Sequence, residues 1–283
     1  MIVFPNCKIN LGLTIKGKRI DGYHDLETVF YPVGVRDVLE IVSAGTRDLQ
    51  GENTPVHFFD SGLPVDGDKK ENLCVKAYNL LKKDFNQLSR VSMHLHKAIP
   101  IGAGLGGGSS NGAFVLQLLN SMFSLNLTND QLICYAAQLG SDCPFFVINK
   151  PCLATSRGEI MEEVPLDLSA YSLVLVNPGI HINTGWAFSQ LEFAPERQTA
   201  PGATHLNEII LQPVSTWKQT LVNDFEKPVF ASFPEVKKIK EDLYHEGAIY
   251  ASLTGTGSTV YGLFEKATIP GITFSAGYTV MIS

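Results

Sequence analysis

The segment from Pro100 to Ser110, PIGAGLGGGSS, constrains this chain more than any other. Five of its eleven positions are glycine. Because glycine lacks a Cβ atom, the backbone there can adopt positive φ angles and approach a ligand closely. An alternating, strand-like run precedes the segment at residues 91–97, and an apolar helical run follows it at residues 113–119. A glycine loop between a strand and a helix start points backbone N–H groups and a helix dipole at an anion, so the sequence predicts a phosphate-binding loop.

Several kinds of glycine loop are distinguished by their surroundings. The segment fits G-x-G-x-x-G, but a dinucleotide site needs an acidic residue about 20 positions later. The candidate, Asp130, lies instead in a predicted helix capping box that begins at Thr128. A Walker loop would need a lysine before Ser109, and the V-A-I-K strand of protein kinases is not visible in the sequence. A glycine-rich surface turn is a further alternative, although turns rarely need five glycines.

The composition is that of a globular chain of about two domains, given its 283 residues. A net charge of −6 disfavours loose binding to nucleic acid or to an anionic membrane. We see no secretory signal and no apolar run long enough to span a membrane. The five cysteines form no C-x-x-C pair and are expected to be reduced thiols of a cytoplasmic protein. His94 and His96 lack a third ligand at a metal-like spacing, so we expect ordinary strand histidines.

Strands and helices alternate in the first half of the chain, and the pattern restarts after Cys152. Strands are predicted at residues 9–15, 38–42, 91–97, 173–176, 249–253 and 260–264. Helices are predicted at residues 70–81, after the glycine loop, from the Thr128 cap to Leu139 with a left-handed Gly140, and from a Ser232 capping box to Gly247. Residues 194–213 are expected to form a loop, and the domain boundary is placed near residue 153.

Two charged residues are candidates for catalysis. Asp142 follows a predicted helix end and precedes Pro144. The helix dipole does not stabilise a carboxylate there, so a functional role and a solvated loop are equally good interpretations. Lys8 precedes a strongly apolar strand and is expected to be partly buried. It then needs an acidic neighbour or an anionic ligand, unless its side chain extends back to solvent.

The turn Asp21-Gly22-Tyr23-His24 carries an aromatic ring and an imidazole. It is either a hairpin turn whose tyrosine covers the core or a platform for a flat ring, and composition does not choose between them. Phe188 is more often a core residue than a ligand contact, judged by its residue type.

These segments together resemble the superfamily of small-molecule kinases named after galactokinase, homoserine kinase, mevalonate kinase and phosphomevalonate kinase, the GHMP kinases. The matching motifs are residues 8–13 (KINLGL), Pro100 to Ser110, and residues 253–259 (LTGTGST). Residues 21–30 and 139–146 are most similar to the branch that phosphorylates a cytidine diphosphate alcohol in the non-mevalonate isoprenoid pathway. The resemblance runs from about residue 5 to residue 264.

The resemblance implies an α+β, two-domain fold. Residues 1–153 would form an N-terminal domain that is ribosomal protein S5 domain 2-like and carries the ATP phosphate loop. Residues 154–283 would form a ferredoxin-like C-terminal domain. The implied activity is ATP-dependent phosphorylation of the 2-hydroxyl of diphosphocytidyl methylerythritol, with ATP and Mg²⁺ as cofactors and no nucleic-acid or membrane partner.

The resemblance also implies roles for individual residues. Lys8 and Asp142 match the catalytic pair, with Asp142 accepting the proton of the alcohol and Lys8 stabilising charge. The chain departs from the pattern at Asn6-Cys7, where Pro-Ala is usual, and at Ser141, where alanine is usual. Neither change removes a catalytic group, but both could alter the surroundings of Lys8 and Asp142.

The binding residues follow in the same way. Asn72 and Lys97 match contacts to adenosine, and Ser110 is the expected protein contact to Mg²⁺. The substrate residues are Asn10 together with the cytosine contacts Tyr23, His24 and Phe188. The phosphate loop comprises Pro100, Ile101, Gly102, Ala103, Gly104, Leu105, Gly106, Gly107, Gly108, Ser109 and Ser110.

Two functions of other classes stay open. A nucleotide-binding oxidoreductase would bind NAD and would not turn over ATP. A catalytically silent relative would act as a ligand sensor or an interaction protein, because folds are reused freely. The presence of both Lys8 and Asp142 argues against the silent relative.

Overall fold

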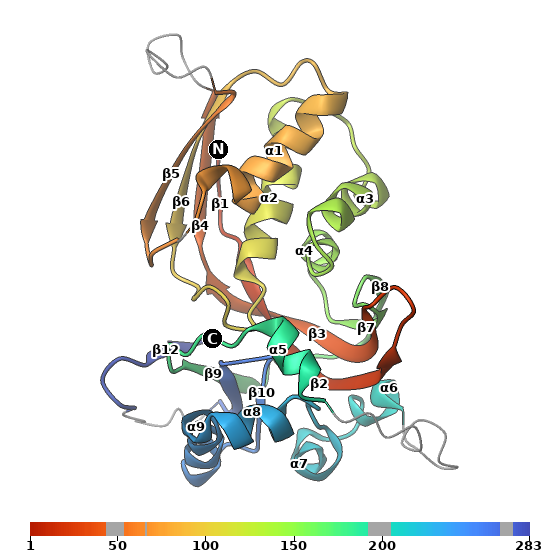
Figure 1. Cartoon of the computed structure of the whole chain (residues 1–283), viewed down its shortest axis with the longest axis vertical. Coiled ribbons are helices and arrows are strands. Elements are labelled where there is room, and N and C mark those ends of the chain that lie inside the picture. Colours follow the sequence, from red (N-terminus) through yellow and green to blue (C-terminus); the bar gives the residue numbers. More distant parts are fainter. Residues whose placement is uncertain (44–53, 66, 192–204, 267–273) are drawn as a thin grey trace. The chain divides into compact units, whose positions relative to one another are not determined.

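The computed structural model describes the whole chain except residues 44–53, 66, 192–204 and 267–273. The chain divides into two compact units (Figure 1). The first unit comprises Met1–Cys7, Gly34–Ile101 and Gly106–Asn149, and the second comprises Lys8–Val33, Gly102–Leu105 and Lys150–Ser283. This division differs from one boundary near residue 153, because two early strands form a sheet with strands that follow residue 150.

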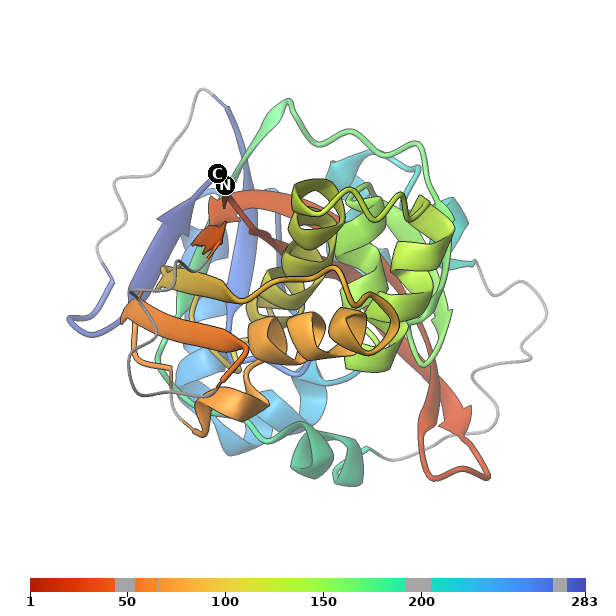
Figure 2. The ribbon, with the colours of Figure 1, turned by 90° about the horizontal axis from the view of Figure 1, so that it is seen from above.

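The first unit is a four-stranded sheet with helices on one face. The strand order is β1 (Ile2–Val3), β4 (Val38–Ser43), β6 (Val91–Lys97) and β5 (Val56–Gly62), and β5 and β6 run parallel. The helices are η1 (Lys69–Glu71), α1 (Leu73–Asp84), α2 (Gly107–Met122), α3 (Asn129–Leu139) and α4 (Cys143–Ile148). Helices α1 and α2 pack next to the sheet, and α3 and α4 lie outside them (Figures 1 and 2).

The α3 region tests the local predictions. The capping box is confirmed: Gln131 N donates to Thr128 Oγ1 at 3.3 Å, and Thr128 N donates to Gln131 Oε1 at 2.9 Å. The predicted left-handed Gly140 is wrong, since its φ of 168° is extended backbone. The extended Gly140 is followed by α4, which begins at Cys143 and which the sequence did not predict.

The second unit contains two four-stranded sheets. One has the order β2 (Asn6–Lys18), β3 (His24–Arg36), β7 (Cys152–Ser156) and β8 (Ile160–Glu163). The other is antiparallel throughout, with the order β10 (Tyr250–Leu253), β11 (Val260–Glu265), β9 (Tyr171–Asn177) and β12 (Thr279–Ile282). The helices of the second unit are α5 (Thr184–Ser189), α6 (Leu206–Ile209), α7 (Trp217–Thr220), α8 (Glu226–Ser232) and α9 (Pro234–His245). The short η3 (Val214–Thr216) precedes α7.

Helix α9 begins differently from the prediction. The expected capping box at Ser232 is wrong, because Ser232 is the last residue of α8 and Phe233 precedes α9 without a side-chain cap. Pro234 occupies the first turn, and Gly247 follows the helix end with a φ of +95°, as expected.

The loop predicted at residues 194–213 belongs to the second unit. Part of the predicted 194–213 loop lies outside the described residues, and Leu206–Ile209 within it is helical.

A buried apolar cluster joins the β9–β10–β11 sheet to α8 and α9. Together with the mixed helix and strand content of both units, this confirms the predicted α+β class. Among the described helices none is long and apolar enough to cross a bilayer.

Candidate active site

The second half of the glycine loop forms the start of helix α2 in the first unit. Strand β6 ends at Lys97 and α2 begins at Gly107, so the predicted order of strand, loop and helix is confirmed. Gly106 is the N-cap with a φ of +68°, and no side chain caps the helix. The first-turn N–H groups of a helix have no intrahelical partner. A positive dipole end with uncapped donors is therefore available to an anion.

The first half of the loop packs against the third motif in the second unit. Gly104 has a φ of +77°, and a Cβ atom there would lie 2.1 Å from the backbone oxygen of Thr254. The hydroxyl of Thr254 donates to Gly104 O at 3.1 Å. In addition, Lys8 N donates to Leu105 O at 3.0 Å. The second unit thus joins the loop directly to Lys8 and to the Thr254 turn.

Lys8 was predicted to be partly buried and is more deeply buried than that, with an exposed fraction of 4%. Its Nζ donates to Asn10 Oδ1 at 2.6 Å and lies 5.0 Å from the ring centroid of Phe30. Asn10 is held in turn: its Nδ2 donates to Thr28 Oγ1 at 3.0 Å, and its N–H donates to Thr254 Oγ1 at 3.0 Å. The β2 and β3 strands and the third motif therefore fix the direction of the lysine side chain.

Asp142 is half-buried and lies immediately before α4 in the first unit. Its side chain makes no capping hydrogen bond to that helix. Its neighbour Cys143 forms a side-chain hydrogen bond with Ser109 in the first turn of α2. Burial raises the pKa of the Cys143 thiol to about 12, opposed by the Ser109 hydrogen bond and assisted by the charge of Asp142. A neutral thiol thus links the Asp142 turn to the end of the glycine loop.

Ser110, in the first turns of α2, has a side-chain oxygen without a hydrogen-bond partner. The side chain is completely buried, and its Oγ has no hydrogen-bond partner. Buried hydroxyl groups normally have a partner, so this atom needs an explanation. Within the described ranges no group of three or more His, Cys, Asp or Glu side chains could hold a metal ion.

The two predicted adenosine residues have different surroundings. Asn72 caps α1 by accepting from Cys74 N at 2.9 Å, and it lines a cavity of about 120 Å³ together with Phe58 and Val65. Lys97 is buried, with an exposed fraction of 2%, and its ammonium forms an ion pair with Asp37.

The predicted cytosine residues lie in the second unit. The rings of His24 and Phe188 are stacked, with centroids 4.6 Å apart and planes inclined by 14°. Tyr23 has an exposed fraction of 58%, and the guanidinium of Arg157 lies 5.1 Å from its ring centroid. Burial lowers the pKa of His24, as does the charge of Lys18. The lowered pKa favours the neutral imidazole, which has one nitrogen that donates a hydrogen bond and one that accepts.

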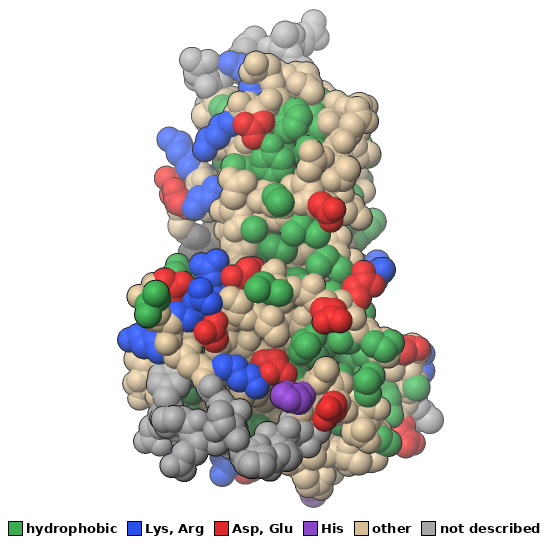
Figure 3. Space-filling view, turned by 90° about the vertical axis from the view of Figure 1, so that its right-hand side faces the viewer, with side chains coloured by type: hydrophobic (Ala, Val, Ile, Leu, Met, Phe, Trp, Pro, Cys, Tyr) green, Lys and Arg blue, Asp and Glu red, His purple; other side chains and the backbone are tan. Residues whose placement is uncertain are grey.

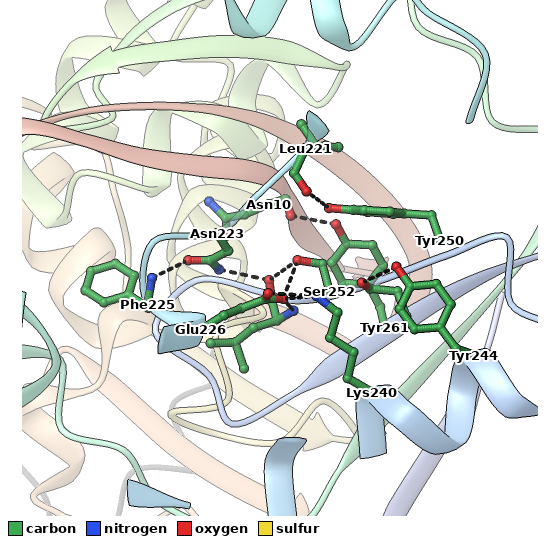
Figure 4. Close-up of polar contacts among 12 residues, drawn as sticks. Asn10, Leu221, Asn223, Phe225, Glu226, Lys240, Tyr244, Tyr250, Ser252 and Tyr261 are labelled. Atoms are coloured by element: carbon green, nitrogen blue, oxygen red, sulfur yellow. Dashed lines mark hydrogen bonds and ion pairs between the residues drawn. The ribbon is translucent and has the colours of Figure 1, made fainter. Parts of the chain in front are cut away.

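The sequence prediction missed the support behind the third motif (Figure 4). Asn223 Nδ2 donates to the carbonyl oxygens of Leu253 and Gly255, both at 2.9 Å. Glu226 Oε1 accepts from Leu253 N at 3.0 Å, and its carboxylate pairs with Lys240 at 2.7 Å. No local pattern marks these residues, because the pairs are separated by between 14 and 32 positions in sequence.

Comparison with known proteins identifies the architecture. The family model of the GHMP kinases N terminal domain matches residues 72–150, and that of GHMP kinases C terminal matches residues 213–272. The 4-diphosphocytidyl-2-C-methyl-D-erythritol kinase of Azobacteroides pseudotrichonymphae is 49% identical, with 97% of each chain covered. That of Bacteroides thetaiotaomicron is 48% identical over 95% of this chain and 94% of its own. A crystal structure of 4-(cytidine 5'-diphospho)-2C-methyl-D-erythritol kinase has a TM-score of 0.76 at 30% identity, covering 93% of this chain and 90% of that one.

Proposed function

This chain belongs to the 4-diphosphocytidyl-2-C-methyl-D-erythritol kinases of the GHMP kinase family, and we propose that it phosphorylates the 2-hydroxyl of that alcohol with ATP. A kinase of isoprenoid biosynthesis is the function that these relationships support. The structural observation that carries the proposal is the buried Lys8, whose backbone N–H is bonded to Leu105 of the glycine loop. A buried ammonium beside a phosphate-binding loop suits the handling of transferred phosphate.

In this proposal the glycine loop holds the phosphates of ATP. Phosphoryl transfer depends on positioning and on stabilisation of the negative charge of the transferred group. The uncapped N–H groups at the start of α2 supply fixed dipoles for that purpose. A net charge of −6 makes such local donors important, because the overall field of the protein repels an anion.

Asp142 acts as the general base and Lys8 stabilises the developing charge. A tertiary alcohol is a crowded and weakly acidic nucleophile, so its proton must be removed as the phosphoryl group arrives. Asp142 adjoins the loop through Cys143 and Ser109, and Lys8 adjoins it through Leu105. The pairing of the two residues in one reaction rests on the kinase relatives, whose similarity to this chain extends over nearly its whole length.

Among the described residues, one side chain, that of Ser110, offers a suitable oxygen for a magnesium ion at the start of α2. Ser110 Oγ is a buried oxygen without a partner among the described residues, and a hydroxyl oxygen is a suitable ligand for Mg²⁺. We propose that Ser110 would hold the ion through its hydroxyl oxygen. When bound, Mg²⁺ would neutralise phosphate charge.

Substrate recognition is assigned to Asn10, Tyr23, His24 and Phe188, and nucleotide recognition to the cavity beside Asn72. The exposed Tyr23 ring is suited to stacking against a cytosine. In this proposal the base displaces the His24 ring from the face of Phe188 that it covers, so that Phe188 stacks on the base and His24 turns to bond its edge. The cavity beside Asn72 is lined by two apolar residues, Phe58 and Val65, and by four charged ones, and we assign the adenosine part of ATP to it.

The partners and the compartment are proposed on charge and redox grounds. Acidic and basic side chains are interspersed on the face shown in Figure 3, which fits a small-molecule substrate better than nucleic acid. All five cysteines are free thiols, and four of them are buried. Free thiols are typical of a reducing compartment, so we propose a cytoplasmic location.

A coupled assay of ADP release tests the function. The cytidine diphosphate alcohol should be turned over, whereas mevalonate, homoserine and galactose should give little activity. Lys8→Met should lower kcat by about a hundredfold or more, because it removes a charge that stabilises the transition state. Lys16→Met is the matched control on the same strand, since Lys16 is partly exposed and paired with Glu27. Binding of NAD without ATP turnover would favour an oxidoreductase, and binding of the alcohol without turnover would favour a sensor.

A further inference from the structure

A completely buried carboxylate, Asp37, lies at the end of β3, one residue before β4 begins. Its two oxygens accept four hydrogen bonds. Oδ1 accepts from the backbone N–H groups of Ala98 at 2.8 Å and Ile99 at 2.9 Å. Oδ2 accepts from Asn111 Nδ2 at 2.9 Å and from the ammonium of Lys97. Such a concentration of donors on one buried carboxylate defines its position closely.

The donors to Asp37 come from both sides of the glycine loop. Ala98 and Ile99 follow strand β6 and immediately precede Pro100, where the loop begins. Asn111 lies in α2, immediately after Ser110, where the loop ends. One carboxylate therefore fixes the separation between the end of the strand and the start of the helix. All of these residues belong to the first unit.

Lys97 fills the space beneath the loop. Its Nζ lies 2.8 Å from the position that a Cβ atom of Gly107 would occupy, and it is 3.4 Å from Asn111 Oδ1. The ammonium is thus in contact with the first residue of α2. Because the side chain is 2% exposed and paired with Asp37, its charge is largely compensated where it stands.

We propose that Asp37 is the positioning residue of the phosphate loop: with Lys97 and Asn111 it sets the geometry of the donors at the start of α2, and thereby the affinity for ATP, without touching the nucleotide. The proposal rests on the proposed function, in which this loop holds the phosphates of ATP. Lys97 then acts on the nucleotide through the helix start that it supports.

Stability by itself does not account for this cluster. Desolvation of two charges offsets much of their attraction, so a buried ion pair is often no more stabilising than a well-packed apolar pair. Removal of one partner, however, leaves an uncompensated charge and is strongly destabilising. What an apolar pair cannot reproduce is the directed bonding of Asp37 to Ala98, Ile99 and Asn111. The hydrogen bonds that Asp37 accepts, more than its negative charge, hold the two ends of the loop in place.

The test compares three variants with the wild type, whose ATP binding and turnover are measured first. Asp37→Asn keeps the shape but leaves Lys97 unpaired, and should raise the dissociation constant of ATP by on the order of tenfold. Asp37→Leu combined with Lys97→Met removes both charges. It should be free of the uncompensated charge that destabilises Asp37→Asn, although Ile99 N and Asn111 Nδ2 still lose their buried acceptor, and it should still bind ATP about tenfold more weakly. The KM for the cytidine substrate should change by less than about twofold in both.

The third variant is a control for general destabilisation of the same unit. Tyr78 is buried in α1, and its hydroxyl donates to Ser89 O at 2.9 Å. Tyr78→Phe should lower the melting temperature without changing ATP affinity. Hydrogen exchange gives a readout independent of activity: the amides of Ala98 and Ile99 should exchange faster in both Asp37 variants and not in Tyr78→Phe.

The outcomes are distinguishable. The proposal is overturned if the double variant regains wild-type ATP affinity, or if Tyr78→Phe weakens ATP binding as much as the Asp37 variants do. If Asp37→Asn does not fold, the double variant decides the question by two readouts together: weaker ATP binding supports the proposal only if the amides of Ala98 and Ile99 also exchange faster, and weaker binding with unchanged exchange assigns Lys97 a direct contact and overturns the proposal. A wild-type protein that neither binds nor turns over ATP would refute the proposed function and not the structural role, which the exchange of Ala98 and Ile99 tests separately.

Discussion

The imidazole of His24 lies face to face with the ring of Phe188, with 4.6 Å between the ring centroids. Phe188 and Phe225 also form an edge-to-face pair, with centroids 4.9 Å apart. The ring is thus held by two neighbours in the second unit. This pre-arrangement lowers the entropy cost of binding a planar group, because the ring does not need to be ordered first.

We therefore predict that Phe188→Ala weakens recognition of the base. Stacking is worth about 1–3 kcal/mol per base, so the KM for the cytidine substrate should rise roughly tenfold to a hundredfold. The KM for ATP serves as the internal control and should not change. The uridine analogue should be a poor substrate of the wild type, because its N3–H and O4 reverse the donor and acceptor pattern of cytosine. Equal kcat/KM for the two substrates would contradict base recognition.

Asp142→Asn tests the general base. The amide keeps the size of the side chain but cannot take the proton of the alcohol, so turnover should fall on the order of a hundredfold or more. ATP affinity, measured by calorimetry, should be nearly unchanged. Turnover within a few-fold of the wild type would show that another group accepts the proton.

Gly106→Val tests the glycine loop. Gly106 has a φ of +68°, which a β-branched residue adopts only with strain, and it directly precedes the uncapped turn of α2. ATP binding should collapse, while the melting temperature of the unliganded protein should fall modestly. Gly247→Ala is the control for the backbone strain itself, since Gly247 has a φ of +95° and a Cβ atom there would contact nothing within 4 Å. Unchanged ATP affinity in Gly106→Val would remove the loop from the site.

Glu226→Gln tests the support behind the third motif. The variant loses the charge that pairs with Lys240, so the free energy of unfolding should fall by about 1.5–3 kcal/mol. Turnover should fall as well, because Glu226 bonds Leu253, which precedes Thr254. Asp242→Asn on α9 is the matched control: its pair with Lys238 is exposed, and such pairs contribute about 0.3–0.5 kcal/mol. Equal effects of the two variants, measured by thermal unfolding and by turnover, would contradict this role.

The sequence predicted those strands and helix ends whose residues form a recognisable pattern within a few positions of one another. Strand β6 occupies residues 91–97 as expected, because its side chains alternate between buried and more exposed positions. The box at Thr128 was predictable because both partners lie within one helical turn. Helix α4 was missed because its six residues, CPFFVI, form an apolar run too short to show helical periodicity.

The site was predictable as far as motifs mark it. The burial of Lys8 followed from the apolar strand around it, and the start of α2 followed from the glycine loop. The Asp37 cluster was not predictable, because Asp37 is separated from Lys97 by 60 positions and from Asn111 by 74. Residues so far apart meet through the order of β4 and β6 in the sheet, which a local pattern does not encode.

The near-contact between Gly104 and Thr254 has a consequence for anyone who redesigns this enzyme. A Cβ atom at position 104 would lie 2.1 Å from the backbone oxygen of Thr254, so no other amino acid fits there while the Thr254 turn keeps its place. Glycine is therefore required at position 104 whichever side chain stands at 254, and the Thr254 hydroxyl adds a hydrogen bond to Gly104 O across 150 positions of sequence. A mutant library aimed at a new base should keep Gly104 and Thr254 and place its diversity around the proposed base contacts, Tyr23 and Phe188.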